Sequence, residues 1–276
     1  MRRTIKSELK RLVNWSVYAF ENNAVGRYVC AQIVSNRMNR TEKVSHRGLA
    51  LLFAIPNALS KYRAETFSIK EPATLQWIDS MPNGSILWDI GANVGLYSCY
   101  AAKRRGCRVF AFEPSPFNLE LLARNIFLND LTDQITVVPL PLSDTLARGT
   151  LNMTNTEWGG ALSTFGKAYG HDGEALHNVF EFSTVGISMV DAVALLNVPQ
   201  PDYIKIDVDG IEHLILKGGK SVLLKTKGVL IEINDRFTAQ AESANKYLSE
   251  AHFFLSEKAP TDAERYVCNQ IWTKRE

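Results

Sequence analysis

The sequence has few cysteines and no cysteine pair of the kind that holds a metal ion or a disulfide framework. Four cysteines are scattered along 276 residues, and no C-x-x-C pair occurs. This spacing argues against a zinc ribbon and against a disulfide-stapled secreted domain. It predicts reduced, mostly buried thiols in a cytoplasmic protein, and we expect no resident metal.

Long hydrophobic runs are also missing. No apolar run approaches the ~18 residues that a membrane-spanning helix needs. The longest, residues 48–55, stops at Pro56-Asn57. Charged residues from Lys6 to Arg11 interrupt the apolar residues near the N-terminus, so a signal peptide is not expected. These absences agree with a cytoplasmic location.

Neither sign of charge dominates overall, but the charges are unevenly distributed. The formal net charge is +2, yet residues 1–70 hold 13 Lys and Arg against 4 Asp and Glu, and the rest hold 18 against 25. Between Ile5 and Phe20 the apolar residues recur at helical spacing with basic residues between them, which predicts a basic amphipathic helix. Such a helix can lie on an anionic membrane surface, join a homo-oligomer, or dock on its own domain.

The most informative stretch surrounds a glycine-containing turn. Residues 85–88 form an apolar run that predicts a buried strand, Asp89 ends it, and a helix is predicted from Leu96 onward. A second apolar run, residues 108–112, ends in Glu113. Strand, turn, helix, strand and acid make one βαβ unit that suits a nucleoside. Glu113 can accept hydrogen bonds from both ribose hydroxyls.

The glycine spacing indicates which nucleoside. A dinucleotide site needs glycines at the first, third and sixth positions of the turn. With Gly91 as the first position, the third is Asn93 and the sixth is Leu96. The turn has the form D-x-G-x-N-x-G, with Asp89, Gly91, Asn93 and Gly95. A turn without the glycines that hold a pyrophosphate suits a ligand without phosphate. We therefore predict that the ligand is S-adenosylmethionine, with Asp89 facing the ammonium of its methionine moiety. The alternative is that Asp89 only caps the next helix and the glycines only shape the turn.

Three blocks of the sequence resemble FkbM-type methyltransferases. They are Asp89-Ile90-Gly91-Ala92-Asn93-Val94-Gly95, Phe112-Glu113-Pro114-Ser115-Pro116, and residues 204–212 followed by Leu216-Lys217-Gly218-Gly219. The similarity runs from about Leu49 to near the C-terminus. It implies a class I methyltransferase fold, S-adenosylmethionine as methyl donor and usually a hydroxyl acceptor on a sugar or natural product. The chain departs from the family at Asp209, where the family usually has Glu.

Strands alternating with helices predict a doubly wound, mainly parallel sheet, the Rossmann-like arrangement of class I methyltransferases, with an N-terminal helical extension. We expect the extension over residues 1–46 and the methyltransferase domain over residues 47–276. Strands are also predicted over residues 47–55 and 64–69, flanking the Pro56-Asn57 turn. Residues 266–272 are predicted to close the sheet.

Ligands in such sheets lie at the carboxyl ends of the strands. This rule groups Asp89, Glu113 and Asp207, and Glu232 falls at a further strand end. Ser143 and Asp144, after the third strand, are predicted to reach the adenine, although an ordinary turn explains them equally well. They complete the predicted cofactor residues.

Asp207 is the first candidate for a general base or for positioning the acceptor, and Asp209 is the second. A divalent cation held by these two carboxylates is an alternative with weak support. Three histidines offer further bases but fit solvated or packed roles equally well: His171, His177 and His213. Residues 158–163, an aromatic beside paired glycines, are predicted to form a substrate loop or a plain surface connection.

Three classes of function remain. The first is O-methylation of a hydroxyl on a glycan, glycolipid or secondary metabolite. The second is N-methylation, or methylation of protein or RNA, although the Asn-Pro-Pro-Tyr type block of amino-methylating enzymes is absent and nucleic acid is not an expected partner. The third is a catalytically silent scaffold, which has no need to keep Asp89, Glu113 and Asp207 together.

Overall fold

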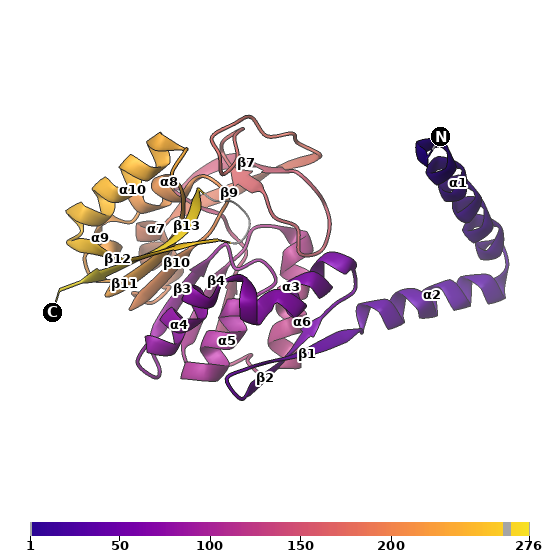
Figure 1. Ribbon diagram of the computed structural model, residues 1–276, viewed down its shortest axis with the longest axis horizontal. Coiled ribbons are helices and arrows are strands. Elements are labelled where there is room, and N and C mark those ends of the chain that lie inside the picture. Colours follow the sequence, from indigo (N-terminus) through magenta and orange to yellow (C-terminus); the bar gives the residue numbers. More distant parts are fainter. Residues whose placement is uncertain (1, 262–265, 276) are drawn as a thin grey trace.

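A central sheet organises this computed structural model, which describes residues 2–261 and 266–275, with only the backbone described for residues 2–6 (Figure 1). Its order in the described chain is β12-β13-β11-β10-β3-β4-β5. All neighbours from β11 to β5 are parallel, whereas β13 runs antiparallel to β11 and β12. The strands are β3 (Ile86–Ile90), β4 (Arg108–Phe112), β5 (Ile135–Val138), β10 (Tyr203–Ile206), β11 (Gly228–Asn234), β12 (Phe253–Pro260) and β13 (Val267–Lys274). The prediction of a mainly parallel, doubly wound sheet is confirmed.

Helices cover both faces of this sheet (Figure 1). On one face lie α4 (Pro72–Ser80), α5 (Leu96–Arg105) and α6 (Pro116–Leu128). On the other lie α7 (Met189–Leu196), α8 (Glu212–Lys217), α9 (Lys220–Leu223) and α10 (Thr238–Glu250). Two hydrophobic cores result, because successive side chains of a strand point to opposite faces.

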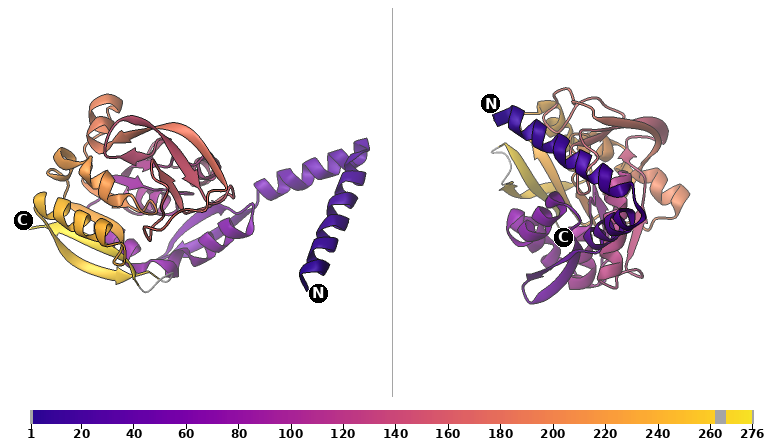
Figure 2. Two further views of the ribbon diagram at one scale, coloured as in Figure 1. Left: turned by 90° about the horizontal axis from the view of Figure 1, so that it is seen from above. Right: turned by 90° about the vertical axis from the view of Figure 1, so that its right-hand side faces the viewer.

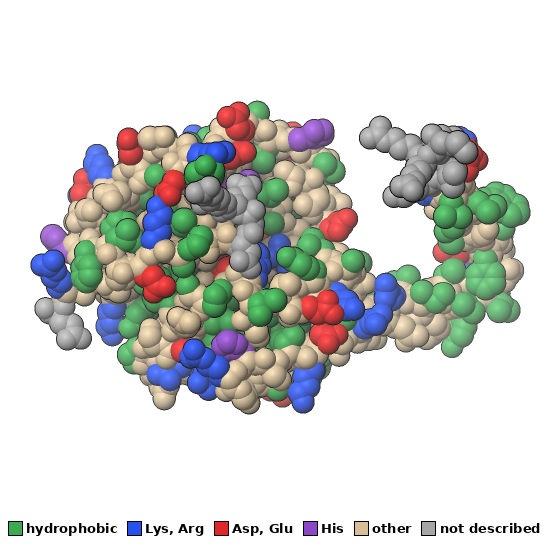
Figure 3. All heavy atoms as spheres, in the orientation of Figure 1, with side chains coloured by type: hydrophobic (Ala, Val, Ile, Leu, Met, Phe, Trp, Pro, Cys, Tyr) green, Lys and Arg blue, Asp and Glu red, His purple; other side chains and the backbone are tan. Residues whose placement is uncertain are grey.

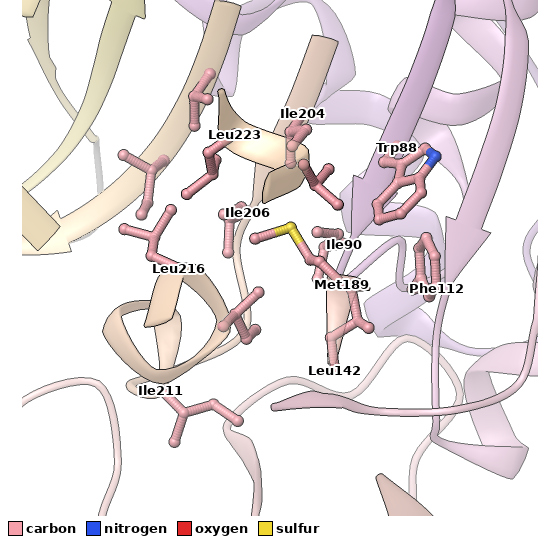
Figure 4. Packing of buried hydrophobic residues seen from close by; sticks show 14 of the residues in the cluster. Trp88, Ile90, Phe112, Leu142, Met189, Ile204, Ile206, Ile211, Leu216 and Leu223 are labelled. Carbon is pink, nitrogen blue, oxygen red and sulfur yellow. The ribbon is translucent and has the colours of Figure 1, made fainter. Parts of the chain in front are cut away.

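The strand β3 shows how this alternation builds the site. Trp88 and Ile90 point into the core shared with α7, α8 and α9, where they meet Ile204, Met189 and other apolar side chains (Figure 4). Leu87 belongs to the opposite core, and Asp89 follows it on the same face. The register pairs Asp89 with Lys205 on β10, so the alternation places a carboxylate and an ammonium side by side within the sheet.

A smaller sheet extends the fold beside the carboxyl edge of the central one. Its order in the described chain is β6-β9-β7-β8, with β6 (Leu142–Ser143), β7 (Ala147–Met153), β8 (Ser163–Phe165) and β9 (Phe180–Ser188). The connection from β7 to β8, residues 154–162, therefore leaves this sheet next to the strand ends.

A hairpin of β1 (Thr41–His46) and β2 (Leu49–Ala54) lies against the helices of the first face. Asn125 of α6 and Asn129, which caps the end of that helix, bind the outer edge of β2. Asn125 Oδ1 accepts a hydrogen bond from the amide of Ala54 at 2.8 Å, and Asn129 bonds both the amide and the carbonyl of Leu52. They occupy backbone groups that an edge strand leaves unpaired. The hairpin turn contains the predicted boundary between residues 46 and 47.

The predicted strand over residues 64–69 is wrong, because these residues belong to α3 (Ala58–Lys70). The helix is favoured by a capping box that the prediction overlooked: Asn57 Oδ1 accepts from the Ser60 amide, and Ser60 Oγ accepts from the Asn57 amide. A second correction concerns β13, which does not close the sheet but lies between β11 and β12. Helix α10 was not predicted at all; it buries only a narrow stripe that includes Ala244 and Leu248.

The N-terminal arm consists of α1 (Arg2–Glu21) and α2 (Ala24–Met38). The predicted amphipathic helix is confirmed as α1, and α2 continues the helical extension. Figures 1 and 2 show that α2 leaves the domain beside β1 and that α1 turns back from its far end without reaching the body. No helix among the described residues is both long and apolar enough to cross a membrane. Three of the four cysteines are buried as expected, and Cys30 on α2 is partly exposed; all four are free thiols.

Candidate active site

Two cavities adjoin at the carboxyl ends of β3, β4, β10 and β11, which we call the rim. The smaller has a volume of about 60 Å³ and the larger about 350 Å³. They share a common wall that is lined by Gly91, Asn93, Ala161, Asp207 and Asp209. The rim thus brings the predicted glycine turn and both predicted catalytic carboxylates into one place.

Glu113 lies in the smaller cavity at the tip of β4. Its carboxylate accepts hydrogen bonds from the amide of Asn93 at 2.8 Å and from the amide of Ser115 at 2.7 Å. Burial raises the pKa of Glu113 to about 7, and these two amides and the Asn118 side chain oppose the shift. Three donors use only part of the acceptor capacity of a carboxylate, so acceptor capacity remains for a hydroxyl group of a ligand. Phe112, Leu142 and Ile211 supply apolar wall beside it.

Lys205 connects two of the predicted site residues from within the sheet. It is only 2% exposed, and its ammonium lies 3.0 Å from Asp207 and 3.7 Å from Asp89. Burial alone would raise the pKa of Asp207, but the Lys205 charge and hydrogen bond outweigh it and hold that pKa below the usual value. Asp207 therefore stays ionised and is a weak proton acceptor.

Asp89 lies beneath the cavities and does not line either of them. Its Oδ2 accepts a 2.5 Å hydrogen bond from Ser98 on α5, while its buried Oδ1 has no hydrogen-bond partner among the described residues. Gly91 and Gly95 shape the turn with positive φ values of 82° and 80°. A Cβ on Gly91 would lie 1.8 Å from the carbonyl oxygen of Asp207, so only glycine lets β3 and β10 end this close together.

Asp209 has a structural task that the sequence did not reveal. Its Oδ2 accepts hydrogen bonds from the amides of Leu162 at 2.7 Å and Ser163 at 3.2 Å. Its backbone is left-handed with φ 63°, a conformation that Asp tolerates better than most residues. Burial and the nearby Asp207 charge raise its pKa, against the two amides. Asp209 faces the loop it holds, and its described bonds go to that loop.

This loop, residues 158–163, forms a roof over both cavities, and we call it the roof loop. Arg63 Nε on α3 donates to the carbonyl of Gly159 at 2.6 Å, and Asn93 Nδ2 donates to the carbonyl of Gly160 at 2.7 Å. Asn118 on α6 bonds both glycines. Bonds from four sides fix the backbone here, so the segment predicted to be a substrate loop or a plain connection lies directly over the site.

Glu232 lines the larger cavity from within β11, two residues before that strand ends. Register places it beside Asp207, because β10 and β11 are parallel and Ile206 pairs with Ile231. Partial burial raises its pKa well above the usual value, and the neighbouring charges of Asp207 and Asp209 raise it further. The two adjacent carboxylates thus have pKa values displaced in opposite directions. Arg63 and Lys70 of α3 supply positive charge to the same cavity.

Ser143 and Asp144 lie away from both cavities. They line a separate surface cavity, and Asp144 Oδ2 accepts a 2.8 Å bond from Lys217. Leu140, Pro141 and Leu142, directly before them, line the smaller cavity instead. Among the candidate histidines, His171 lines the larger cavity, whereas His213 packs its ring against Phe237 and His177 is exposed.

Several cavity residues were not predicted. Lys205 could have been found, because a lysine in the apolar run Tyr203-Ile204-Lys205-Ile206 requires a buried partner. Leu140 and Leu142 follow β5 directly and give an apolar surface at a strand end. Arg63, Lys70 and Tyr97 carry no such signal, since their positions depend on how α3 and α5 pack beside the rim.

The chain is similar to known methyltransferases. The model of the methyltransferase FkbM domain matches residues 89–257, from the tip of β3 into β12. The chain is 23% identical over 253 residues to the hexuronic acid methyltransferase AglP of Haloferax volcanii, covering 90% of each protein. It is 35% identical over 100 residues to the methyltransferase sdnD of Sordaria araneosa, covering 35% of this chain and 38% of that protein.

Solved structures include more distant likenesses. One is the precorrin-6y C5,15-methyltransferase of Geobacter metallireducens, with a TM-score of 0.44, 14% identity, and coverage of 77% of this chain and 89% of that one. Another is the tRNA m1G37 methyltransferase of M. jannaschii, with a TM-score of 0.48, 13% identity, and coverage of 86% and 58%.

Proposed function

The chain belongs to the FkbM methyltransferase family, and from this premise we propose that it transfers a methyl group from S-adenosylmethionine to a hydroxyl of a glycan, glycolipid or secondary metabolite. The observation that carries the proposal is the pair of adjoining cavities. One offers a carboxylate and apolar walls, and the other offers two carboxylates with opposed pKa shifts. Two binding spaces that share one wall suit a donor and an acceptor.

The residues of the smaller cavity fit the nucleoside part of this donor. Glu113 has lone pairs for the ribose hydroxyls, and Phe112, Leu142 and Ile211 suit a flat base. The close approach of the chain at Gly91, where a Cβ has no room, suits the methionine part on the shared wall. The bound donor supplies a methyl group made electrophilic by a sulfonium. Asp207, kept ionised by Lys205, supplies negative charge on that wall.

The proton of the acceptor hydroxyl goes to Glu232 in this proposal. A carboxylate whose pKa is raised accepts a proton more readily than one whose pKa is lowered, and a positioned base contributes roughly 10²–10⁴-fold. Asp207 was expected from the sequence to be the base. In this proposal it instead stays ionised and supplies negative charge on the shared wall. Asp209, the second candidate, holds the roof loop over both cavities.

The acceptor in this proposal carries an acidic group. Arg63 and Lys70 line the larger cavity, and the related AglP is named a hexuronic acid methyltransferase. A carboxylate on a sugar ring finds the cations of Arg63 and Lys70 there, the latter 3.7 Å from Glu71, while its hydroxyls face Glu232.

The test is transfer of labelled methyl from S-adenosylmethionine to a cell extract separated into glycan, lipid, protein and RNA fractions. Label should enter the glycan or lipid fraction with the wild-type chain and be lost with Glu232→Gln, whereas the exposed control Glu242→Gln should behave as wild type. Label in the protein or RNA fraction alone would contradict the proposed acceptor class. No transfer to any fraction, despite donor binding, would support a silent scaffold.

A further inference from the structure

The N-terminal arm exposes apolar side chains that the domain does not cover. Every residue from 7 to 25 is exposed. On α1 five exposed apolar residues form one stripe at helical spacing, and the exposed Tyr18 lies on the opposite side of the helix; the five are Leu9, Leu12, Val13, Val17 and Phe20. Leu12 is 60% exposed and Trp15, beside the stripe, is 67% exposed. In Figure 3 these hydrophobic side chains gather on the arm, apart from the body. A contiguous apolar surface of this kind marks an interaction site.

The other side of α1 is polar and basic. Lys10 borders the stripe beside Val13 and Val17, and Arg11 lies opposite it, 3.7 Å from Glu8; residues 1–70 as a whole hold 13 basic residues against 4 acidic ones. An exposed apolar stripe with Trp and Phe, with Lys beside it and Arg opposite, is the side-chain arrangement of a helix that lies in the plane of a membrane interface. The tryptophan at the edge of the stripe suits the headgroup level.

The joint between α1 and α2 is built to hold α1 away from the domain. Asn23 accepts a 2.8 Å bond from the Gly26 amide and donates a 3.1 Å bond to the carbonyl of Phe20. A Cβ on Gly26 would lie 1.7 Å from that carbonyl, so the helices pass closer there than another residue allows. The 15 residues of α2 span about 22 Å. The arm therefore presents α1 at a distance from the rim.

We propose that α1 binds an anionic lipid surface, with Leu12 and its neighbours among the acyl chains and Lys10 and Arg11 at the headgroups. A second copy of the chain is the competing occupant. A symmetric dimer would place the same basic region of both copies at one interface, because a two-fold contact joins identical patches. Lipid phosphates neutralise that charge instead. The charge of the arm therefore favours the membrane surface.

The test uses the full chain with vesicles of phosphatidylcholine alone and of phosphatidylcholine mixed with phosphatidylglycerol. Wild type should sediment with the anionic vesicles. High salt should release it, because added ions screen the attraction between the basic side chains and the lipid phosphates. Leu12→Glu should weaken this binding roughly 10–100-fold, since an inserted Leu contributes about 1.5–3 kcal/mol. Leu195→Glu on α7 is the matched control, because Leu195 is 58% exposed, and it should bind as wild type.

Three outcomes would overturn the proposal. One is absence of binding to anionic vesicles by a wild-type chain that is folded by circular dichroism. Another is a wild-type dimer in analytical ultracentrifugation that Leu12→Glu dissociates while vesicle binding is unaffected, which would assign the stripe to a second copy. Equal loss of vesicle binding in Leu12→Glu and Leu195→Glu would also remove α1 as the binding element.

Discussion

The rim and the N-terminal arm depart from the usual distribution of side chains in opposite directions. At the rim, charged groups are buried, and an ammonium that is 2% exposed lies between two carboxylates. On the arm, apolar groups face solvent, and Leu12 and Trp15 are more than half exposed. Buried charge and a contiguous exposed apolar stripe are the two uncommon arrangements in a folded chain.

The two regions are stabilised by different kinds of contact. The rim holds its charges through contacts made by distant parts of the chain, because Asp89 comes from β3, Lys205 and Asp207 from β10 and its end, and Glu232 from β11. The arm is held by local contacts at Asn23 and Gly26 and receives little from the domain. Changes at the rim should therefore affect chemistry and folding together, and changes on α1 should affect neither.

The largest effect is expected from Glu232→Gln. Gln keeps the shape of Glu but cannot accept a proton, so kcat should fall roughly 10²–10⁴-fold while the donor still binds. In wild type, turnover should rise with pH as Glu232 ionises above its raised pKa, and this limb should disappear in the variant. The measurement is a pH profile of methyl transfer to the acceptor found in the fractionated extract. A normal profile in Glu232→Gln would assign the proton to another group, with Asp207 first.

Lys205→Met is expected to lower the free energy of unfolding by an amount similar to the rise in the activation barrier in Glu232→Gln. The substitution leaves the carboxylates of Asp89 and Asp207 without the ammonium that separates them. Removing one partner of a buried pair costs about 3–5 kcal/mol. Asp207 is 29% exposed, so the lower end is expected. Urea unfolding measures the change, with Lys103→Met on the exposed side of α5 as control. Equal stability of both variants would show that the buried lysine is dispensable.

Sequence could predict the parts of the rim that belong to single strand ends. Asp89, Glu113 and Asp207 each end an apolar run, so their placement follows from the alternation and the parallel sheet. The glycine turn could also be predicted, because it directly follows one of these strand ends. Asp209 was assigned to chemistry because the sequence places it on the turn, whereas its partners, Leu162 and Ser163, come from a loop 46 residues or more away.

The remaining failures also lie in long-range packing. Ser143 and Asp144 follow β5 as expected, but the chain turns into β6 and leaves Leu140 and Leu142 at the cavity. The strand predicted over residues 64–69 has apolar residues that also suit a helix face, and the cap at Asn57 decides between them. The arm was predicted as a helical extension, yet only the structure shows that the domain leaves it uncovered.

A third, smaller effect concerns the pH dependence of folding. Burial raises the pKa of Glu113 to about 7 from a usual 4.5. Below about pH 4.5 the group is protonated in both states and its contribution to stability is full. As the pH rises to about 7 only the unfolded state loses the proton, so stability falls by about 3 kcal/mol. Glu113→Gln should remove this part of the fall in urea unfolding between these pH values. An unchanged slope in the variant would contradict the raised pKa.

The smallest effect is expected on the arm. Leu12→Glu should change the free energy of unfolding of the domain by less than about 0.5 kcal/mol, because the leucine has no covering partner. Leu75→Ala on α4, where the side chain is fully buried, should cost about 2–5 kcal/mol in the same urea experiment. A large loss in Leu12→Glu would mean that α1 packs on the domain in solution.

Calorimetry with S-adenosylhomocysteine tests the central claim most directly, because it requires no knowledge of the acceptor. The account predicts binding by the wild-type chain, strong weakening in Glu113→Ala, and wild-type affinity in the exposed control Glu242→Ala. It also predicts no comparable binding of NAD, since the turn at Gly91 lacks the dinucleotide spacing. Equal binding by Glu113→Ala and wild type, or tight binding of NAD alone, would contradict the assignment of the rim as a methyl-donor site.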